Sequence, residues 1–432
     1  MYMHSASPSP GKRPNLTALW VIGGLVVALI VTVAGNLVYT ELRGDDDASG
    51  PAPVTSEPKE VWSWTSDQEV AYAQDLPNGG ALVSLSGDSG GIVTLDKSGK
   101  EMWRDEKHPY NTARVHEKEQ LIEASWYVAR ATSSGSTSDS GTILFDFDGK
   151  VLWEAPEGND LYSIQEDGSY LVSDDDSMTK LDPKTYEESW TIMGTWFSPT
   201  DTAIYALDGG DVVRYSLDGK EEWRTALPAG YDDGLDEYDL TYLYTSDEML
   251  LVASGSLLAF APDTGKQLWA ESTRGEVIPA ANGRYVVVPT AQSDPVTGSN
   301  DPLEGPFPIF GPEGHVADID LATSDAYLTM DVIELDGRPV NFHQSSGTLF
   351  DADGTVIAKG YDHVTKALDE GGYTVDGSTI GYRAWNSEKA AWTLDLEGVD
   401  SMADDYYPED VRVSPAKHGI YVNDKTSVRL YR

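Results

Sequence analysis

The stretch Phe260-Ala261-Pro262-Asp263-Thr264-Gly265-Lys266-Gln267-Leu268-Trp269 decides the fold, because its pattern returns along the chain. An apolar residue ends a short run of strand-forming residues, a polar turn containing glycine follows, and a tryptophan stands four residues after the glycine. Glycine tolerates the positive φ that tight hairpin turns require, so the pattern indicates two antiparallel strands joined by a turn. Each copy therefore predicts a β-hairpin.

The copies differ in their residues but keep the same spacing. Three others keep both glycine and tryptophan, and they end at Trp103, Trp153 and Trp223. Trp190 and Trp392 keep the spacing without the glycine, while the copy from Gly354 to Ala358 loses the tryptophan. A tryptophan at one offset in successive units predicts a structural wedge that packs against the neighbouring unit. The predicted structural tryptophans are Trp62, Trp103, Trp153, Trp190, Trp223, Trp269 and Trp392.

Units of this size that cannot bury their own faces stack in a ring or a line. Seven hairpins lie inside the chain, and the C-terminal run Ser427–Tyr431 and the early run Val61–Trp64 are strands without local partners. Pairing these two runs forms an eighth unit and removes an exposed edge. We therefore expect an all-β protein, an eight-bladed β-propeller over residues 60–432, with seven blades as the alternative.

The repeat L/F-D-x-x-T-G-K-x-x-W resembles that of the PQQ-binding-like β-propeller family, and it is closest between Phe260 and Trp269. The resemblance covers most of residues 60–432 and implies a propeller fold. Because the repeat concerns how blades pack, it does not specify an activity. The chain departs from the family's dehydrogenases, which carry a disulfide between adjacent cysteines, since it contains no cysteine. The resemblance therefore favours a membrane-anchored branch that is not a dehydrogenase, and no PQQ or calcium is predicted except as an alternative.

An apolar run before the repeats predicts attachment to a membrane. Residues 19–40 are long enough for a helix to cross about 30 Å of hydrocarbon. Basic Lys12 and Arg13 precede the run and acidic residues follow it, which places residues 1–18 in the cytoplasm and the propeller outside the cell membrane. A cleaved signal peptide is the alternative. Residues 41–59 are acidic and rich in proline, which predicts a flexible stem.

Composition restricts the partners. The chain has 72 acidic and 30 basic residues, a net charge of −42, which repels phosphate backbones and excludes nucleic acid. Such acidity is usual for solubility, and attraction of a cation or a basic partner is the functional alternative. The complete absence of cysteine excludes disulfides, so stability must come from the core and from ring closure.

Sequence patterns suggestive of catalysis or metal binding have simpler explanations. Gly87-Asp88-Ser89-Gly90-Gly91 matches the nucleophile segment of chymotrypsin-like proteases, but no partner motif accompanies it. Asp146-x-Asp148-Gly149 and Asp351-x-Asp353-Gly354 open like calcium loops, but neither reaches the required glutamate, and both coincide with hairpin turns. The histidines are isolated. We therefore predict no catalytic residue and no metal site.

One long segment predicts a contact surface. Residues 289–315 contain several prolines together with Phe307, Ile309 and Phe310. These apolar residues either fold back to cap the propeller's own funnel or anchor a partner, and the second reading makes them the predicted partner-binding residues. The acidic segment from Tyr231 to Tyr238 would form a polar rim. The predicted function is a membrane-tethered, extracytoplasmic propeller that binds a protein or a small ligand without catalysis. The alternative is an enzyme, either a PQQ- and calcium-dependent oxidoreductase or one that acts on envelope glycan.

Overall fold

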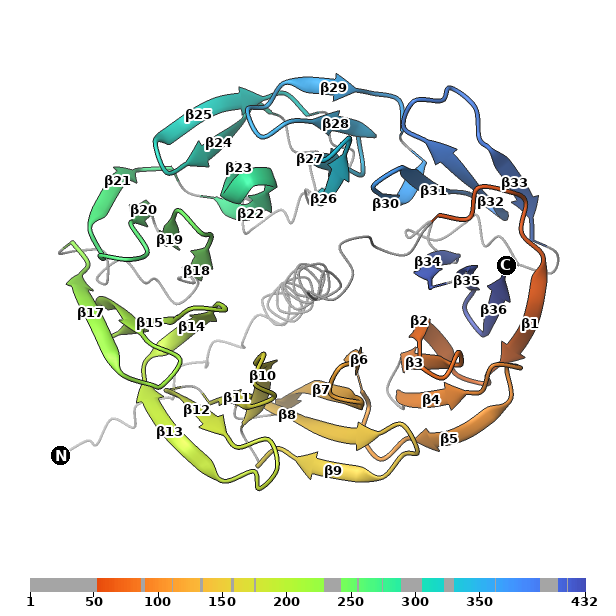
Figure 1. The fold of residues 1–432 in the computed structure, drawn as a ribbon, viewed down its shortest axis with the longest axis horizontal. Coiled ribbons are helices and arrows are strands. Elements are labelled where there is room, and N and C mark those ends of the chain that lie inside the picture. Colours follow the sequence, from red (N-terminus) through yellow and green to blue (C-terminus); the bar gives the residue numbers. More distant parts are fainter. Residues whose placement is uncertain are drawn as a thin grey trace, which may run out of the picture. The chain divides into compact units, whose positions relative to one another are not determined.

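The chain forms nine sheets of four antiparallel strands each, arranged around a common axis (Figure 1). The computed structural model describes residues 53–432 apart from 87–89, 111, 133–134, 157–158, 175, 229–241, 255, 274, 289–304, 322–329, 362, 397–410 and 418. In eight sheets the strands follow one another in chain order, and in the ninth the first strand of the chain joins the last three. The chain is a β-propeller.

We number the sheets as blades along the chain. Blades 1 to 3 consist of β2 (Glu69–Asp75), β3 (Ala81–Ser86), β4 (Gly91–Leu95) and β5 (Glu101–Asp105); β6 (Thr112–His116), β7 (Leu121–Thr132), β8 (Gly135–Asp146) and β9 (Val151–Glu154); and β10 (Asp160–Ile164), β11 (Tyr170–Ser173), β12 (Ser177–Leu181) and β13 (Glu188–Met193). Blades 4 to 6 consist of β14 (Thr195–Pro199), β15 (Ile204–Asp208), β16 (Asp211–Tyr215) and β17 (Glu221–Ala226); β18 (Tyr242–Thr245), β19 (Leu250–Ala253), β20 (Leu257–Phe260) and β21 (Gln267–Glu271); and β22 (Glu276–Ala280), β23 (Arg284–Val288), β24 (Phe307–Gly311) and β25 (Gly314–Ile319). Blades 7 to 9 consist of β26 (Met330–Leu335), β27 (Arg338–His343), β28 (Thr348–Phe350) and β29 (Val356–Ala358); β30 (Val364–Leu368), β31 (Gly371–Asp376), β32 (Thr379–Ala384) and β33 (Trp392–Asp395); and β34 (Arg412–Ala416), β35 (Gly419–Asn423), β36 (Ser427–Tyr431) and β1 (Glu60–Thr65).

The chain divides into two compact units. Pro51–Val128 and Asp139–Arg432 form one unit, which contains the ring of blades. The other takes in Ala129–Ser138, the ends of β7 and β8. The candidate site described below lies wholly within the first unit.

The two ends of the chain close the ring, as predicted. β1 pairs antiparallel with β36, and Trp62 lies opposite Leu430 in the register. The main chains of Lys59 and Arg432 exchange two further hydrogen bonds of 2.8 and 2.9 Å. This pairing leaves neither β1 nor β36 as an unpaired strand, so blade 9 is held by both ends of the sequence.

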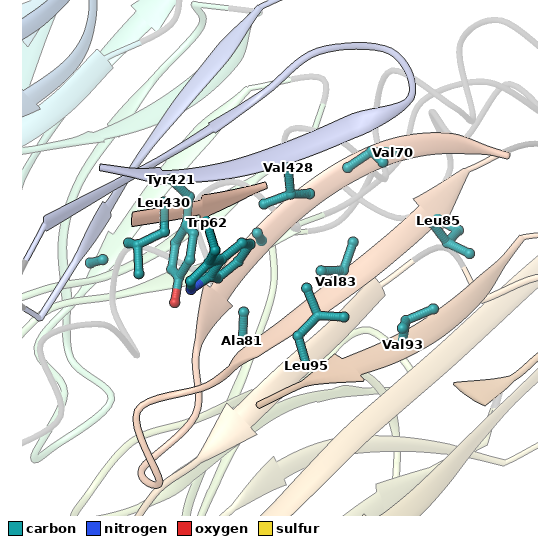
Figure 2. Packing of buried hydrophobic residues seen from close by; sticks show 12 residues of the cluster. Trp62, Val70, Ala81, Val83, Leu85, Val93, Leu95, Tyr421, Val428 and Leu430 are labelled. Atoms are coloured by element: carbon teal, nitrogen blue, oxygen red, sulfur yellow. The ribbon is translucent and has the colours of Figure 1, made fainter. Parts of the chain in front are cut away.

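The hydrophobic core is divided among the junctions between neighbouring blades. The described residues form nine buried clusters, and each joins one pair of consecutive blades. Figure 2 shows the cluster that joins blade 9 to blade 1, where Trp62 and Tyr421 meet Val83 and Leu95. Each blade buries both faces against its neighbours, because alternate residues of a strand point to opposite faces.

The prediction of eight blades, or seven, is wrong. The missed unit is the hairpin of β24 and β25, which falls in the segment that the sequence indicated as a long loop. Its turn contains Pro312 and it has Ala317 where other blades have tryptophan, so it lacks the repeat pattern. The strands form nonetheless, since their alternate residues Phe307 and Ile309 are buried between blades 6 and 7.

Little of the described structure is helical. One 3₁₀ turn, η1 (Ala281–Gly283), joins β22 to β23, and the described residues contain no helix long and apolar enough to cross a membrane. The predicted spanning run, residues 19–40, lies outside the described residues, as do residues 1–18 and the first part of the predicted stem. Of that stem, residues 53–59 are described, and Val54 packs against the core between blades 8 and 9.

Candidate functional site

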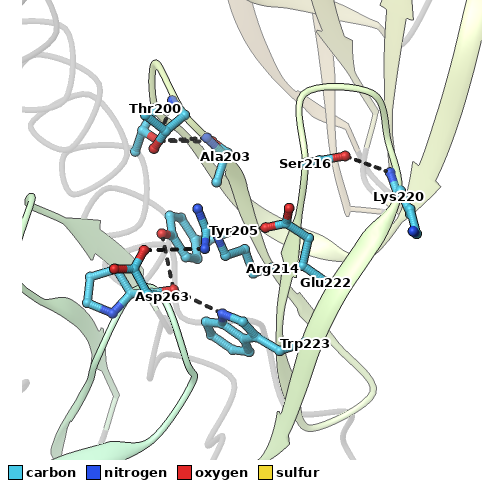
Figure 3. Close-up of polar contacts among 11 residues, drawn as sticks. Thr200, Ala203, Tyr205, Arg214, Ser216, Lys220, Glu222, Trp223 and Asp263 are labelled. Atoms are coloured by element: carbon cyan, nitrogen blue, oxygen red, sulfur yellow. Dashed lines mark hydrogen bonds and ion pairs between the residues drawn. The ribbon is translucent and has the colours of Figure 1, made fainter.

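Except in blade 8, the tryptophan of the repeat packs over the hairpin turn of the next blade. Figure 3 shows this at the junction of blades 4 and 5, where Trp223 Nε1 donates a 2.9 Å hydrogen bond to the carbonyl oxygen of Pro262. The indole lies directly on Gly265, since a Cβ atom there would stand 2.6 Å from Trp223 Cε3. Glycine at this position thus serves both the positive φ of the turn, +64°, and the close approach of the ring.

The other predicted tryptophans occupy equivalent positions in the register. Trp62, Trp103, Trp190 and Trp269 face Gly99, Gly149, Gly219 and Gly314 of the following blade. Trp153 stacks on Tyr186, which takes the glycine position with a φ of +57°. Blade 9 has no hairpin turn at the equivalent position, because its outer strands β36 and β1 come from the two ends of the chain. Trp392 Nε1 donates instead to the carbonyl oxygen of Val54. The arrangement is structural at every one of these junctions.

Blades 6 and 7 carry alanine, Ala317 and Ala358, at the tryptophan position. In blade 6 another side chain takes over the contact with the next blade. Ala317 of blade 6 leaves the turn of blade 7 without an indole donor. Arg284 of β23 reaches the same turn, and its guanidinium donates a 3.0 Å bond to the carbonyl oxygen of Ala352. It also pairs with Asp353 on blade 7 and with Glu313 on its own blade. An ion pair thus takes the place of the missing wedge.

The predicted partner contacts do not lie at the surface. Phe307, Ile309 and Phe310 are at most 2% exposed, and all three belong to β24 within the core. Phe310 packs against Trp269 of the preceding blade, with ring centroids 5.3 Å apart. These side chains are therefore part of the junctions between blades. Tyr231 and Tyr238, the predicted rim, lie outside the described residues.

An exposed aromatic residue stands on the inner strand of blade 4. Trp196 is 41% exposed and has a φ of +50°, a conformation in which a bulky residue is strained. It lies in a bulge, because the pairing of β14 with β15 shifts register between Thr195 and Ser198. The bulge lets the next residue, Phe197, enter the core while Trp196 faces outward.

Aromatic side chains of the next two blades continue from Trp196 into the core. Trp196 meets Tyr242 of β18 edge to face, with ring centroids 5.1 Å apart. Tyr242 in turn lies 6.2 Å from Tyr244, which lies 5.8 Å from the buried Tyr285. The Tyr242 hydroxyl is shielded from solvent and bonds to none of the described residues. The result is an aromatic wall with one unused hydroxyl.

A carboxylate stands beside this wall. Glu276 begins β22 and is half-buried, and burial raises its pKa above the usual 4.5. Its charge also acts on Tyr242, and burial with that charge raises the pKa of Tyr242 to about 12. Among the described residues no basic side chain pairs with Glu276. We call Trp196, Tyr242, Tyr244 and Glu276 the Trp196 site.

The ring brings these residues together at one end. Trp196, Tyr242 and Glu276 stand at or near the start of the inner strands β14, β18 and β22 of three consecutive blades (Figure 1). Inner strands of a propeller run in one direction, so their starts share one end of the ring. Aromatic faces attract cations, and a carboxylate strengthens that attraction. The site can therefore hold a positively charged group.

The candidate calcium loops are occupied by their own turns. One carboxylate oxygen of Asp146 accepts hydrogen bonds from the main-chain nitrogens of Asp148 and Lys150, at 3.0 and 2.8 Å. Asp351 binds the nitrogens of Asp353 and Thr355 in the same way. In the part of the chain that the structure describes, no group of three acidic or histidine side chains could hold a metal ion. Residues 87–89 of the protease-like string are not described.

Comparison with known proteins shows no family for this chain. No protein-family model matches the chain, and no curated protein matches it. BamB from Moraxella catarrhalis is 11% identical over 76% of this chain and 97% of its own, with a TM-score of 0.43. A eukaryotic initiation factor is 11% identical over 84% and 90%, with a TM-score of 0.47. The C-terminal WD40 domain of Sif2 is 11% identical over 80% and 100%, with a TM-score of 0.40. The PQQ-binding-like family expected from the repeat is not shown by these likenesses.

One feature of the sequence points to the Trp196 site. Trp196 follows Trp190 by six residues and so falls outside the spacing of the repeat. Trp64, Trp126 and Trp385 also fall outside that spacing, so the sequence alone does not distinguish Trp196 from them. Tyr242 and Glu276 carry no such mark, because only the ring places them beside Trp196.

Proposed function

We propose that the chain is a binding propeller of the cell envelope that takes a basic segment of a protein partner at the Trp196 site. The observation that carries this proposal is Trp196 itself, an exposed indole in a strained backbone conformation. Exposed aromatic residues anchored on rigid strands are frequent energetic centres of protein interfaces. Strain of this kind is retained where the surrounding structure fixes it, and it is common at binding sites.

The negative charge of the chain and of the Trp196 site favours a basic partner. The net charge of −42 attracts cationic chains over distances comparable with the Debye length and raises their rate of association. At the site, Glu276 supplies a local negative charge that its own surroundings do not neutralise within the described residues. A lysine or arginine side chain placed there gains a carboxylate partner and aromatic faces together.

The test uses defined peptides and the full chain. A lysine- and arginine-containing peptide should bind more tightly than a glutamate-containing peptide of equal length, with a strong dependence on salt. Trp196→Ala should weaken that binding about tenfold or more, the range of interface hot spots. Leu268→Ala removes a side chain of similar exposure, 40%, from the outer strand of blade 5 and serves as the matched control. Equal binding by the Trp196→Ala variant would refute the proposed site.

The location of the propeller is a separate part of the proposal. The apolar run 19–40 supports attachment to a membrane, and Lys12 and Arg13 before it support a cytoplasmic N-terminus with the propeller outside the cell. Protease added to intact spheroplasts should release the acidic domain. Release only after lysis would reverse the orientation, and a mature N-terminus after residue 34 would indicate a cleaved signal peptide.

The enzyme alternatives are tested directly. Addition of PQQ and calcium, followed by measurement of dye reduction with alcohols or sugars, examines the oxidoreductase reading. Hydrolysis of envelope glycan by the purified full chain examines the other. The proposal predicts no turnover in either assay.

A further inference from the structure

Blade 7 has the shortest outer half of any blade. β28 and β29 contain three residues each, and β29 ends at Ala358, the position at which seven other blades carry tryptophan. No indole therefore reaches the turn of blade 8. Trp385 enters this junction from the blade 8 side instead, where it packs against Phe342 and donates from Nε1 to the carbonyl oxygen of Leu368.

The face of blade 8 toward blade 7 differs from its other face. Tyr373, Ile380, Tyr382 and Trp392 are buried against blade 9. The residues that alternate with them on the same strands are Gly372, Thr374, Gly381 and Thr393. Small and hydroxyl-bearing side chains thus replace a packed apolar layer on the face that the short strands of blade 7 leave uncovered.

A hollow of 260 Å³ lies on that face. Its lining includes Tyr361, Thr374, Asp376, Arg383, Glu388 and Thr393. Arg383 is fixed in place: its Nη1 donates to the carbonyl oxygen of Gly360 at 2.6 Å, its Nε donates to that of Ser387 at 2.8 Å, and its guanidinium lies 4.3 Å from the centre of the Tyr361 ring. One wall of the hollow is therefore rigid before any ligand arrives.

The lining selects a class of ligand. The carboxylates of Asp376 and Glu388 outnumber the single guanidinium of Arg383 and so disfavour an anion, and the threonine hydroxyls disfavour a purely apolar molecule. No set of three metal-ligating side chains is gathered there among the described residues. The volume is below the usual range of about 300–1,000 Å³ for sites that hold drug-sized molecules. What fits is a small, neutral molecule with several hydroxyl groups, for which the carboxylates and threonines supply acceptors and donors.

We propose that this hollow binds a single sugar residue. The site is formed by blade 8 and the connection that precedes it, and the Trp196 site is formed by blades 4 to 6, so neither proposal depends on the other. Glu388 and Asp376 accept hydrogen bonds from ring hydroxyls, and Thr374 and Thr393 both donate and accept. With about twelve non-hydrogen atoms, the ligand should bind with a Kd of about 1 mM.

The test is saturation-transfer NMR on the full chain with D-glucose, D-galactose, D-mannose, L-rhamnose and N-acetyl-D-glucosamine. At least one of these sugars should bind. Thr374→Val, which keeps the shape but removes the hydroxyl, and Glu388→Gln should each weaken that binding about fivefold or more. Asp218→Asn, which removes an exposed carboxylate from the corresponding turn of blade 4, should leave it unchanged.

A second variant examines the origin of the hollow. Ala358→Trp restores the residue of the repeat, whose indole should reach the turn at Glu388 and exclude the sugar. Its thermal unfolding temperature shows whether the variant is folded, and the two variants above decide the matter if it is not. Binding of none of the five sugars, or binding that survives both Thr374→Val and Glu388→Gln, would overturn the proposal.

Discussion

Replacement of Gly149 by alanine separates the two roles of the turn glycine. Gly149 has a φ of +85°, and a Cβ atom there would stand 2.7 Å from Cδ2 of Trp103. Gly79 has almost the same φ, +81°, but nothing lies within 4 Å of its Cβ position. Gly79→Ala therefore measures the cost of the left-handed backbone alone, about 1–2 kcal/mol. Gly149→Ala adds displacement of the indole to that cost.

The additional cost follows from what Trp103 loses. Its Nε1 donates a 2.9 Å bond to the carbonyl oxygen of Phe147, which contributes about 1 kcal/mol. Its ring is partly buried in the core between blades 1 and 2, so displacement costs about half of the 3–5 kcal/mol typical of removing a buried tryptophan. We expect Gly149→Ala to lower the free energy of unfolding by about 3.5–5.5 kcal/mol in total, against about 1–2 kcal/mol for Gly79→Ala.

Urea unfolding followed by tryptophan fluorescence measures both values. A Trp103→Ala background provides the internal check, because without the indole the cost of Gly149→Ala should fall to that of Gly79→Ala. Equal losses for the two glycine variants in the native background would refute the wedge. A Gly149→Ala cost that persists after removal of Trp103 would do so equally.

Three further changes have defined outcomes. Deletion of residues 427–432 removes β36, the strand that pairs with β1, so it should open the ring and make the chain far more sensitive to protease. Arg432→Ala keeps β36 and should leave the protease sensitivity unchanged. Arg284→Met should lower the free energy of unfolding by about 1–3 kcal/mol, because it removes the hydrogen bond and the ion pair that join blades 6 and 7. Arg224→Met is the control: the ion pairs of Arg224 stay within blade 4, so their loss should cost less than about 1 kcal/mol. Burial raises the pKa of Glu276, so binding of a basic peptide should be lost as the pH falls through that raised pKa, at a higher pH than an ordinary glutamate would cause. Glu276→Gln should abolish this pH dependence. Because the variant removes a buried charge, it should also raise the free energy of unfolding at pH 7.

The sequence was informative wherever a residue acts through its own turn. The D-x-x-G pattern and the following tryptophan locate the outer hairpins, because turn conformation and strand register are local properties. Closure by the two ends was also predictable, since each was a strand without a neighbour. The hairpin of β24 and β25 is not predicted by the repeat, because Ala317 stands where the repeat has tryptophan. The side chain that compensates, Arg284, comes from β23, a different strand that precedes the predicted loop.

The candidate sites depend on distances that the sequence does not contain. Phe307 and Phe310 stand among prolines, which suggests a loop, but Phe307-Pro308-Ile309-Phe310 is an apolar run that the fold buries on both faces of one strand. Tyr242 and Glu276 meet only because consecutive inner strands start at one end of the ring. The hollow beside blade 8 is lined by residues spread from Gly360 to Thr393, which only the fold brings together.

The contacts of Val54 have a mechanical consequence. Its carbonyl oxygen accepts a 2.6 Å hydrogen bond from Trp392 Nε1, and its nitrogen donates a 3.1 Å bond to the Tyr373 hydroxyl, so the chain is latched to blade 8 before it enters β1. A pull applied through the preceding residues loads this latch first and reaches the β1–β36 ladder only after the latch has opened. The closing strand is therefore protected from being peeled off the ring one hydrogen bond at a time.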